Sequence, residues 1–349
     1  MSPSEGSCQL QAVCYITLRS MKLFLGIDGG QTSIKSVLAN QRGRILGTGS
    51  GGPAVHFTDE ATRHQVRESL SRAIQEALRQ AGLSVTQEIE SAFLGVSGVN
   101  GPESPAGTIY RDMIQEEFKA RKICVDLDAR IALAGAIPSR VGVIVIAGTG
   151  SIAFGMNERG ESARVGGWGY LLGDEGSGYD IGRQALIAVG KESDGLGPTT
   201  ALTPLILQSL NIKDATLIPQ IIYRDPAPKL RIAHLCSIAA QAAQRGDAIA
   251  RRLFSKGGKS LGEMACSIIR RLHFDGLSVL ASGVGGVFHA GELIWNPYRQ
   301  EVLRQFPEAE VAPPRFPPVV GALLLAYQNG GEPLSRQLLQ TLSSTNSTN

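Results

Sequence analysis

Residues 23–43 read LFLGIDGGQTSIKSVLANQRG, and this stretch decides the fold. The apolar run Leu23–Ile27 ends at Asp28-Gly29-Gly30, and a second apolar run, Ile34–Ala39, follows the glycines. Two apolar runs separated by a glycine turn are typical of paired strands, and residues 44–47 continue the pattern after a second turn. The stretch therefore predicts a β-meander.

A second copy of this pattern occurs in residues 143–160, which read VIVIAGTGSIAFGMNERG. Four residues recur at a constant separation of 117 positions: Thr32, Asn40, Arg42 and Gly43 match Thr149, Asn157, Arg159 and Gly160. This recurrence within the same strand context indicates an internal duplication, and hence two similar domains. The alternative is a pair of unrelated hairpins that share common turn residues.

Helices and strands are expected to alternate in the rest of the chain. Helical periodicity extends from Glu60 to Ala81 and stops at Gly82, a suitable helix end. Apolar strands are expected at Ser91–Val96, Ile123–Leu127 and Leu277–Ala281. Such alternation predicts an α/β layer architecture.

Five segments make up the expected domain organisation. They are a disordered extension (residues 1–20), an N-terminal domain (21–127), a C-terminal domain with a helical insertion (128–315), terminal helices that could return to the N-terminal domain (316–342), and a disordered tail (343–349).

Composition excludes several classes of protein. The 349 residues include 42 glycines, yet 43% are apolar and no strict glycine period occurs, so the chain is neither collagen-like nor simply disordered. The formal net charge is +3, with no long like-charge block to attract nucleic acid or a membrane surface. No apolar stretch reaches the ~18 residues of a membrane span. We therefore expect specific small-molecule sites, with neither nucleic acid nor membrane as a partner.

Cysteine usage indicates a reducing compartment. The five cysteines are an odd number, and none forms a C-x-x-C pair with metal or redox spacing. A cytoplasmic location is expected, because stable disulfides are rare there.

Three glycine turns follow apolar strands and could bind phosphate groups. They are Asp28–Ser33, Gly148–Ser151 and Gly283–Gly286. Glycine permits close backbone approach, and exposed N–H groups with Thr or Ser hydroxyls can cradle phosphate oxygens. None has Walker A or dinucleotide-binding spacing. One such turn can equally serve a hairpin alone, whereas two duplicated turns favour a nucleotide site.

Asp28 ends a strand that is expected to be buried, where a carboxylate is costly unless it is hydrogen-bonded or near a cation. Mg²⁺ bound to nucleotide phosphates, and held largely through water, would supply that cation. The alternative is a hairpin aspartate that accepts hydrogen bonds from turn N–H groups. The duplicated loop favours the metal role.

Asp126 and Asp128 lie at the end of the strand Ile123–Leu127, just before a helical pattern. Asp128 could cap that helix. The carboxyl end of a strand is also where α/β proteins place catalytic groups, so Asp128 could be a general base that accepts a proton from a substrate hydroxyl. Both roles can coexist.

Glycine is concentrated in one segment. Residues 148–182 hold 11 of the 42 glycines, together with Trp168 and Asp174. An aromatic face followed six residues later by a carboxylate suits a sugar, whose C–H face stacks and whose hydroxyls form hydrogen bonds. Glu175 could instead support the neighbouring loop or the start of a helix.

The combined motifs resemble those of one known family. The stretches LGIDGGQT (residues 25–32), VIAGTGS (145–151) and GGWGYLLGDEGS (166–177) are similar to those of the N-acetylglucosamine kinases. These enzymes belong to the BadF/BadG/BcrA/BcrD ATPase family within the actin-like sugar-kinase superfamily. The resemblance extends from about residue 23 to residue 327 and includes YRD at 223–225 and QRGD at 244–247.

The resemblance implies a fold and an activity. The fold class is α/β, with two ribonuclease-H-like, actin-like ATPase domains and a central cleft that closes on ATP, Mg²⁺ and a sugar. The γ-phosphate would pass to the 6-hydroxyl of N-acetylglucosamine or a related amino sugar or hexose. Family members are commonly dimers, so a homodimer is expected.

Site residues are implied at the positions that match the family motifs. Contacts with ATP are expected from Gly29, Gly30, Thr32, Ser33, Gly148, Thr149, Ala233, Gly283, Gly285 and Gly286. Contacts with the sugar are expected from Asp128, Gly150, Ser151, Gly167, Trp168, Gly169 and Asp174. Asp128 would be the catalytic base, and Asp28 would coordinate Mg²⁺ through water.

Two positions depart from the family pattern. Val55, which precedes His56, stands where the family usually has Asn, and Leu127 stands where a polar residue commonly precedes the base. The first departure bears on the choice of sugar more than on the kinase chemistry. Two other functions stay open: an ATPase that activates a dehydratase or reductase, and a non-catalytic sugar-binding sensor.

Overall fold

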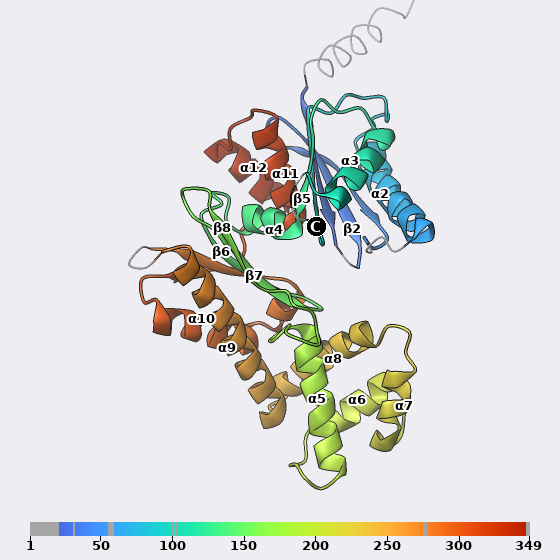
Figure 1. Ribbon diagram of the computed structural model, residues 1–349, viewed down its shortest axis with the longest axis vertical. Helices are drawn as coiled ribbons and strands as arrows, with labels where there is room; N and C mark the ends of the chain where they lie inside the picture. The colour runs from blue at the N-terminus through green and yellow to red at the C-terminus, as the bar shows by residue number, and fades with distance from the viewer. Residues whose placement is uncertain are drawn as a thin grey trace, which may run out of the picture. The chain divides into compact units, whose positions relative to one another are not determined.

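The computed structural model describes residues 21–30, 32–54, 59–99, 101, 103–274 and 278–346 (Figure 1). The chain divides into two compact units. Unit 1 contains the residues up to Pro138 and those from Phe316 onward, and unit 2 is Ser139–Arg315. The predicted extension 1–20 and the positions Val55 and His56 lie outside the described residues.

Unit 1 is built on a five-stranded sheet with the order β3-β2-β1-β4-β5. Its strands are β1 (Leu23–Gly29), β2 (Ile34–Asn40), β3 (Ile45–Gly51), β4 (Ser91–Val96) and β5 (Ile123–Leu127). The first three strands are antiparallel neighbours, which confirms the predicted meander, and β4 and β5 continue the sheet in parallel with β1.

Unit 2 repeats this topology with the order β10-β9-β6-β7-β8. Its strands are β6 (Gly142–Ala147), β7 (Ser151–Met156), β8 (Ser162–Gly166), β9 (Leu280–Val284) and β10 (Glu310–Val311). Strands β6 to β8 form an antiparallel meander, and β9 and β10 add to it in parallel. The α/β prediction of two similar domains is therefore confirmed.

The second turn of each meander is built in the same way. In unit 1 the side-chain oxygen of Asn40 accepts hydrogen bonds from the N–H groups of Arg42 (3.0 Å) and Arg44 (3.2 Å). In unit 2 the side-chain oxygen of Asn157 accepts hydrogen bonds from those of Arg159 (3.1 Å) and Glu161 (3.0 Å). Equivalent bonds at repeat-related asparagines support a duplication rather than two unrelated hairpins.

One face of the unit 1 sheet is covered by α2 (Glu60–Gln80), and α3 (Pro105–Glu117) packs beside α2 and β5. The close approach of α2 depends on alternate glycines of β3, since side chains alternate along a strand. A Cβ atom at Gly47, Gly49 or Gly51 would lie within 2.0 Å of a carbonyl oxygen of α2. The alternating glycines of the pattern Gly-x-Gly-x-Gly therefore allow α2 to pack closely on β3.

Helix α11 (Pro318–Asn329) packs against β1, β2 and β4 and against α4 (Asp128–Ala136), while α12 (Arg336–Asn346) carries two more buried leucines of this unit. A Cβ atom at Gly321 of α11 would lie 1.9 Å from the carbonyl oxygen of Ile131 in α4. This close helix pair assigns α4 to unit 1, so the unit boundary follows Pro138, whereas the predicted boundary followed Leu127.

A long helix, α9, covers the unit 2 sheet, α10 packs against α9 and β10, and a helical insertion separates β8 from α9. The insertion contains α5 (Gly178–Ser193), α6 (Leu202–Leu210), η1 (Ala215–Leu217), α7 (Ile218–Tyr223) and α8 (Pro228–Gln244). Then follow α9 (Ala248–Arg271), η2 (Gly286–Ala290) and α10 (Glu292–Gln305). Asp247 caps α9 by accepting a hydrogen bond from Ala250 N–H at 2.8 Å.

Two predicted ends differ from those in the structure. Strand β9 is Leu280–Val284, three residues later than the expected strand 277–281, because its pairing with β6 extends to Val284. The tail expected from Ser343 is helical as far as Asn346, since the buried Leu338 and Leu342 hold α12. Among the residues described, no helix is both long and apolar enough to cross a bilayer.

Candidate functional site

The carboxyl ends of three parallel strands meet at one edge of the unit 1 sheet. Gly29 of β1 pairs with Val96 of β4, and Val96 pairs with Leu127 of β5. Asp28 is the penultimate residue of β1, and Asp126 and Asp128 flank the end of β5, so sheet register brings the predicted acidic residues to one edge. Such an edge is where open α/β sheets bind their ligands.

Asp28 is a half-buried carboxylate. Its pKa is raised to about 6, chiefly by burial and also by the negative charge of Asp128, while the charge of Lys35 opposes the shift. Asp28 and Asp128 therefore interact electrostatically. Two such carboxylates form a small set of hard oxygen donors, which suits a divalent cation. No cluster of three or more potential metal ligands occurs among the described residues.

Asp128 is the first residue of α4, and Leu127 occupies the cap position. The Oδ1 atom of Asp128 accepts a hydrogen bond from Ala129 N–H at 2.8 Å. Burial raises the pKa of the Asp128 carboxyl above its usual range, although hydrogen bonds from Ala129 and from the Ser97 hydroxyl oppose the rise. The carboxylate thus supports the start of the helix without being its cap, and Ser97 is a contact that the sequence does not reveal.

Asp126 has a different environment. Its Oδ2 lies 2.8 Å from Nη1 of Arg130, one helical turn later, and its Oδ1 accepts a hydrogen bond from Leu127 N–H at 2.7 Å. A buried carboxylate paired in this way is satisfied within the fold.

The first predicted phosphate loop follows β1. Gly29 is buried, Gly30 and Ser33 are half-buried, and Thr32 is exposed. The Gly30 carbonyl accepts a hydrogen bond from Ala54 N–H at 3.0 Å, which ties the loop to the segment after β3. Thr32 is accordingly accessible at the surface of this loop.

The second predicted phosphate loop joins β6 to β7 in unit 2. The Gly148 carbonyl accepts a hydrogen bond from Gly178 N–H at 2.8 Å, and the Thr149 carbonyl accepts one from Tyr179 N–H at 3.3 Å. Both donors lie in the first turn of α5, so the loop is fastened to the start of this helix.

Two other predicted ATP-binding segments lie near this loop. A Cβ atom at Gly178 would lie 3.0 Å from the Gly148 oxygen and 3.3 Å from the oxygen of Ala233 in α8. Gly285 has φ +106°, and a Cβ there would meet the Ala147 oxygen at 2.5 Å, so a residue with a side chain would be strained as well as crowded.

The glycines of the third turn differ in their environment. Gly283 is buried inside β9, and a Cβ there would lie 2.3 Å from the ring of Phe288, so this glycine makes room for packing. Gly286 is exposed and has open space around it. The exposed part of the turn therefore begins at Gly285, two residues later than the sequence suggests.

Asp174 is the central carboxylate of the predicted sugar loop. It is 4% exposed, and its φ of +67° places it in the left-handed region, which is costly for a residue with a side chain. Its Oδ1 accepts a hydrogen bond from Ser151 N–H at 3.2 Å. The Ser151 hydroxyl donates to the Glu175 carbonyl at 2.8 Å, so Ser151 joins the two loops.

Gly150 leaves room for this carboxylate, because a Cβ at Gly150 would lie 2.8 Å from Asp174 Oδ2. A residue that the sequence does not single out also contacts it: Lys229 Nζ lies 3.3 Å from the same oxygen. Lys229 is 55 positions away along the chain, so no local pattern could reveal this pair.

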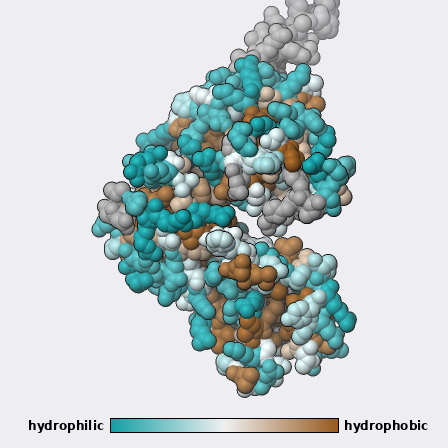
Figure 2. Space-filling view, in the orientation of Figure 1, coloured by the Kyte–Doolittle hydropathy of each residue, from teal (hydrophilic) through white to brown (hydrophobic). Residues whose placement is uncertain are grey.

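The remaining predicted sugar residues lie on the exposed side of the loop. Gly167 is exposed, Gly169 is half-buried, and the Trp168 side chain is 69% exposed. Nine of the ten large apolar side chains that are exposed among the described residues lie between Trp168 and Leu230. Figure 2 shows the corresponding hydrophobic surface over the helical part of unit 2. The Trp168 ring is thus accessible to solvent.

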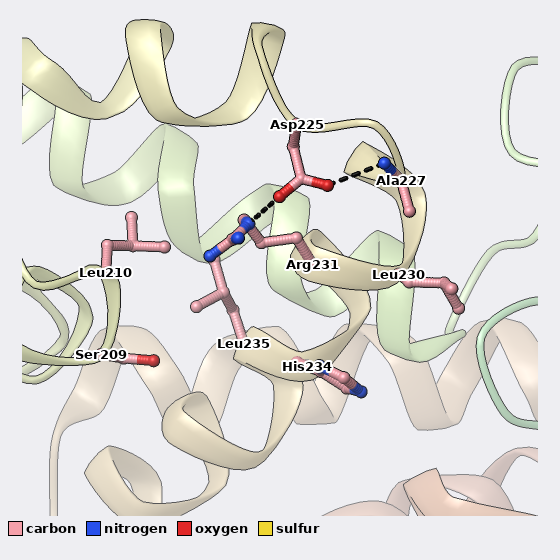
Figure 3. Close-up of a pocket in the computed structure, with 8 residues that line it drawn as sticks. All are labelled: Ser209, Leu210, Asp225, Ala227, Leu230, Arg231, His234 and Leu235. Carbon is pink, nitrogen blue, oxygen red and sulfur yellow. Dashed lines mark hydrogen bonds and ion pairs between the residues drawn. The ribbon is translucent and has the colours of Figure 1, made fainter. Parts of the chain in front are cut away.

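A separate pocket of about 330 Å³ lies between α6 and the start of α8 (Figure 3). Asp225 and Arg231 form an ion pair at its wall, and Asp225 Oδ1 accepts a hydrogen bond from Ala227 N–H at 2.7 Å. Asp225 belongs to the YRD motif, and these contacts show that it fastens the beginning of α8. None of the predicted site residues lines this pocket.

Comparisons with known proteins identify relatives across nearly the whole chain. The chain is 33% identical over 306 residues to the N-acetylmuramic acid/N-acetylglucosamine kinase of Clostridium acetobutylicum, covering 88% of this chain and 98% of that one. It is 30% identical over 325 residues to the N-acetyl-D-glucosamine kinase of Dictyostelium discoideum, covering 89% and 99%.

A solved structure and a family profile agree with these relatives. The crystal structure of a protein from Chromobacterium violaceum described as an N-acetylglucosamine kinase matches with a TM-score of 0.66 at 26% identity, covering 88% of this chain and 99% of that one. Residues 25–326 match the profile of the BadF/BadG/BcrA/BcrD ATPase family. The resemblance inferred from the motifs is confirmed, and the chain belongs to the BadF/BadG/BcrA/BcrD ATPase family.

Proposed function

We propose that this protein is an ATP-dependent sugar kinase that transfers the γ-phosphoryl group to the 6-hydroxyl of N-acetylglucosamine or a related amino sugar. The observation that carries the proposal is the likeness to two kinases at 33% and 30% identity over 98% and 99% of their lengths. The half-buried carboxylates Asp28 and Asp128 and the two glycine loops supply groups suited to this reaction.

Asp128 would act as the general base. Its carboxylate accepts the proton of the sugar 6-hydroxyl while the hydroxyl oxygen forms a bond to the γ-phosphorus and the bond to the bridging oxygen breaks, releasing ADP. Burial raises the pKa of Asp128, which makes its ionised form a stronger base. Helix α4 and the Ser97 hydroxyl would hold the carboxylate in one orientation.

The ATP contacts would come from the glycine loops that follow β1 and β6. Thr32 and Thr149 occupy repeat-related positions and would bind phosphate oxygens, with backbone groups of the same loops, Gly29, Gly30, Ser33 and Gly148, as neighbours. The grouping of Ala233 and Gly285 around the Gly148 loop supports an adenosine contact in unit 2, together with Gly283 and Gly286.

The sugar contacts would come from Asp128 and from the loops around Ser151 and Asp174. Asp174 would accept hydrogen bonds from sugar hydroxyls, and the exposed Trp168 would stack on the C–H face of the ring. Gly150, Gly167 and Gly169 would allow close approach of the backbone.

Asp28 would hold Mg²⁺ through water. The fit follows from the carboxylate pair itself, because burial and the neighbouring Asp128 disfavour the ionised form of Asp28, and a divalent cation would offset that cost. When bound, Mg²⁺ neutralises phosphate charge as the γ-phosphoryl group is transferred. The homodimer and the cytoplasmic location stay predictions.

A coupled assay of ADP release tests the proposal. The sugars are N-acetylglucosamine, N-acetylmuramic acid, glucosamine, N-acetylmannosamine and glucose, with the 6-deoxy analogue of the best substrate as a matched control. We expect turnover with at least one amino sugar and none with its 6-deoxy analogue. Absence of sugar-stimulated ADP release with every sugar would refute the proposal, and sugar binding without turnover would favour a sensor.

The Asp128→Asn variant tests whether Asp128 is the general base. We expect kcat to fall by about 10²–10⁴-fold, as for loss of a general base, with ATP still bound. A near-normal kcat would show that Asp128 is not the base and only supports the start of α4.

A further inference from the structure

Lys229 is the cation that accompanies the Asp174 carboxylate. It lies in the first turn of α8, its Nζ is 3.3 Å from Asp174 Oδ2, and the same Nζ lies 5.4 Å from the centre of the Tyr170 ring. Tyr170 in turn packs edge-to-face on Tyr179 at 5.0 Å. The ammonium group is therefore held between a carboxylate and an aromatic face.

The two partners differ in exposure. The Asp174 side chain is 4% exposed and that of Lys229 is 31% exposed. An ion pair between two exposed side chains contributes little. Removal of the cation from a buried carboxylate is different, because it leaves the charge uncompensated in a poorly solvated place. Loss of the Lys229 ammonium group should consequently matter more than loss of an ordinary surface lysine.

The Asp174 carboxylate keeps one free acceptor. Oδ1 accepts the hydrogen bond from Ser151 N–H, whereas the buried Oδ2 accepts no hydrogen bond from the described part of the chain. Its contact with Lys229 is an ion pair without hydrogen-bond geometry, so the lone pairs of Oδ2 can still accept a hydroxyl donor. Buried acceptors of this kind normally have a partner, and a hydroxyl of a bound sugar would be a suitable one.

Lys229 is carried by a helix whose start is fixed. Asp225 holds the first turn of α8 through Ala227 N–H and through its ion pair with Arg231 (Figure 3). One turn after Lys229, Ala233 lies against the Gly148 loop through Gly178. The same helix face therefore reaches both the predicted sugar carboxylate and the predicted phosphate loop.

We propose that Lys229 is a positioning residue that holds the Asp174 carboxylate in place for a hydrogen bond with a sugar hydroxyl, and so sets the affinity of the enzyme for its sugar. The inference rests on the proposed kinase function. It concerns the sugar side of the site, so ATP affinity should change much less than sugar affinity.

The test compares Lys229→Met, Lys229→Arg and a control, Lys259→Met, whose lysine is 60% exposed and pairs with Glu263 within α9. We expect Lys229→Met to raise the KM for sugar about tenfold to about a hundredfold, with a smaller loss of kcat and an ATP KM within about threefold of wild type. Lys229→Arg should recover most of the sugar affinity, and Lys259→Met should match wild type.

Asp174→Asn supplies the second comparison, because it removes the charge that Lys229 accompanies. We expect Lys229→Met to change the sugar Kd by less than about twofold in the Asp174→Asn background, measured by calorimetry with N-acetylglucosamine. Equal increases in the KM values for sugar and ATP, an unchanged sugar KM in Lys229→Met, or additive effects of the two substitutions would each overturn the inference. Wild-type enzyme without sugar-stimulated turnover would instead overturn the proposed function.

Discussion

The substitution Gly321→Ala tests how the fold holds the proposed base. Helix α11 lies so close to α4 that a Cβ at Gly321 would meet the Ile131 oxygen at 1.9 Å and the Gly135 nitrogen at 2.5 Å. Ordinary contact begins at 3.4 Å, so one of the two helices must move by about 1.5 Å. Because Asp128 begins α4, a shift of α4 displaces the carboxylate.

The expected change in the free energy of unfolding of Gly321→Ala follows from two opposing effects. Overpacking against a backbone carbonyl belongs at the upper end of the usual cost, about 3 kcal/mol, while alanine improves helix propensity by about 1 kcal/mol. We expect a net loss of about 2 kcal/mol in the free energy of unfolding. A misplacement on the order of 1 Å can reduce kcat about 10²-fold, so activity should fall more steeply than stability.

Urea unfolding and the ADP-release assay measure the two effects, and Gly190→Ala is the matched control. Gly190 lies inside α5, and a Cβ there would meet no atom within 4 Å, so this variant should gain roughly 0.5–1 kcal/mol and keep its kcat. The reasoning fails if Gly321→Ala is as stable and as active as wild type, or if Gly190→Ala loses as much stability.

Three further substitutions test separate features. Ser97→Ala removes a hydrogen bond that lowers the pKa of Asp128, so the pKa should rise. Because the ionised base is lost as pH falls through this pKa, the acid limb of the kcat–pH profile should move to higher pH. An unmoved limb would contradict the role of Asp128 as the base. Trp168→Ala should raise the sugar KM and leave the melting temperature unchanged, since this side chain is 69% exposed; an unchanged KM would exclude stacking. Asn40→Ala removes an acceptor shared by two N–H groups and should cost about 1–2 kcal/mol in urea unfolding, unlike the control Gln41→Ala.

Much of the fold could be predicted because local patterns determine it. Strands Ser91–Val96 and Ile123–Leu127 have the bounds expected from their apolar runs, and the duplication is visible in residues that build identical turns. Asn40 and Asn157 are informative because a short amide side chain can bridge the N–H groups of a tight turn. Local chemistry of this kind leaves a trace in the sequence.

Features that depend on distant contacts could not be predicted. The boundary after Pro138 results from packing of α4 on α11, and Gly321 and Ile131 are far apart along the chain. The pairing of Lys229 with Asp174 likewise has no local signal. The ion pair of Asp126 with Arg130, by contrast, joins residues only four positions apart along the chain, at the junction of β5 and α4, so a local reading of the sequence could have suggested it.

The division of unit 1 between both ends of the chain has a consequence for its synthesis. Strands β1 to β5 leave the ribosome first, but α11, which covers Phe24 and Phe93 on one face of their sheet, follows only after the whole of unit 2. At 5–20 residues per second this delay lasts roughly 10–35 s. Unit 2 is continuous and can complete its core during that interval, while the nascent unit 1 exposes an aromatic face that a chaperone could bind.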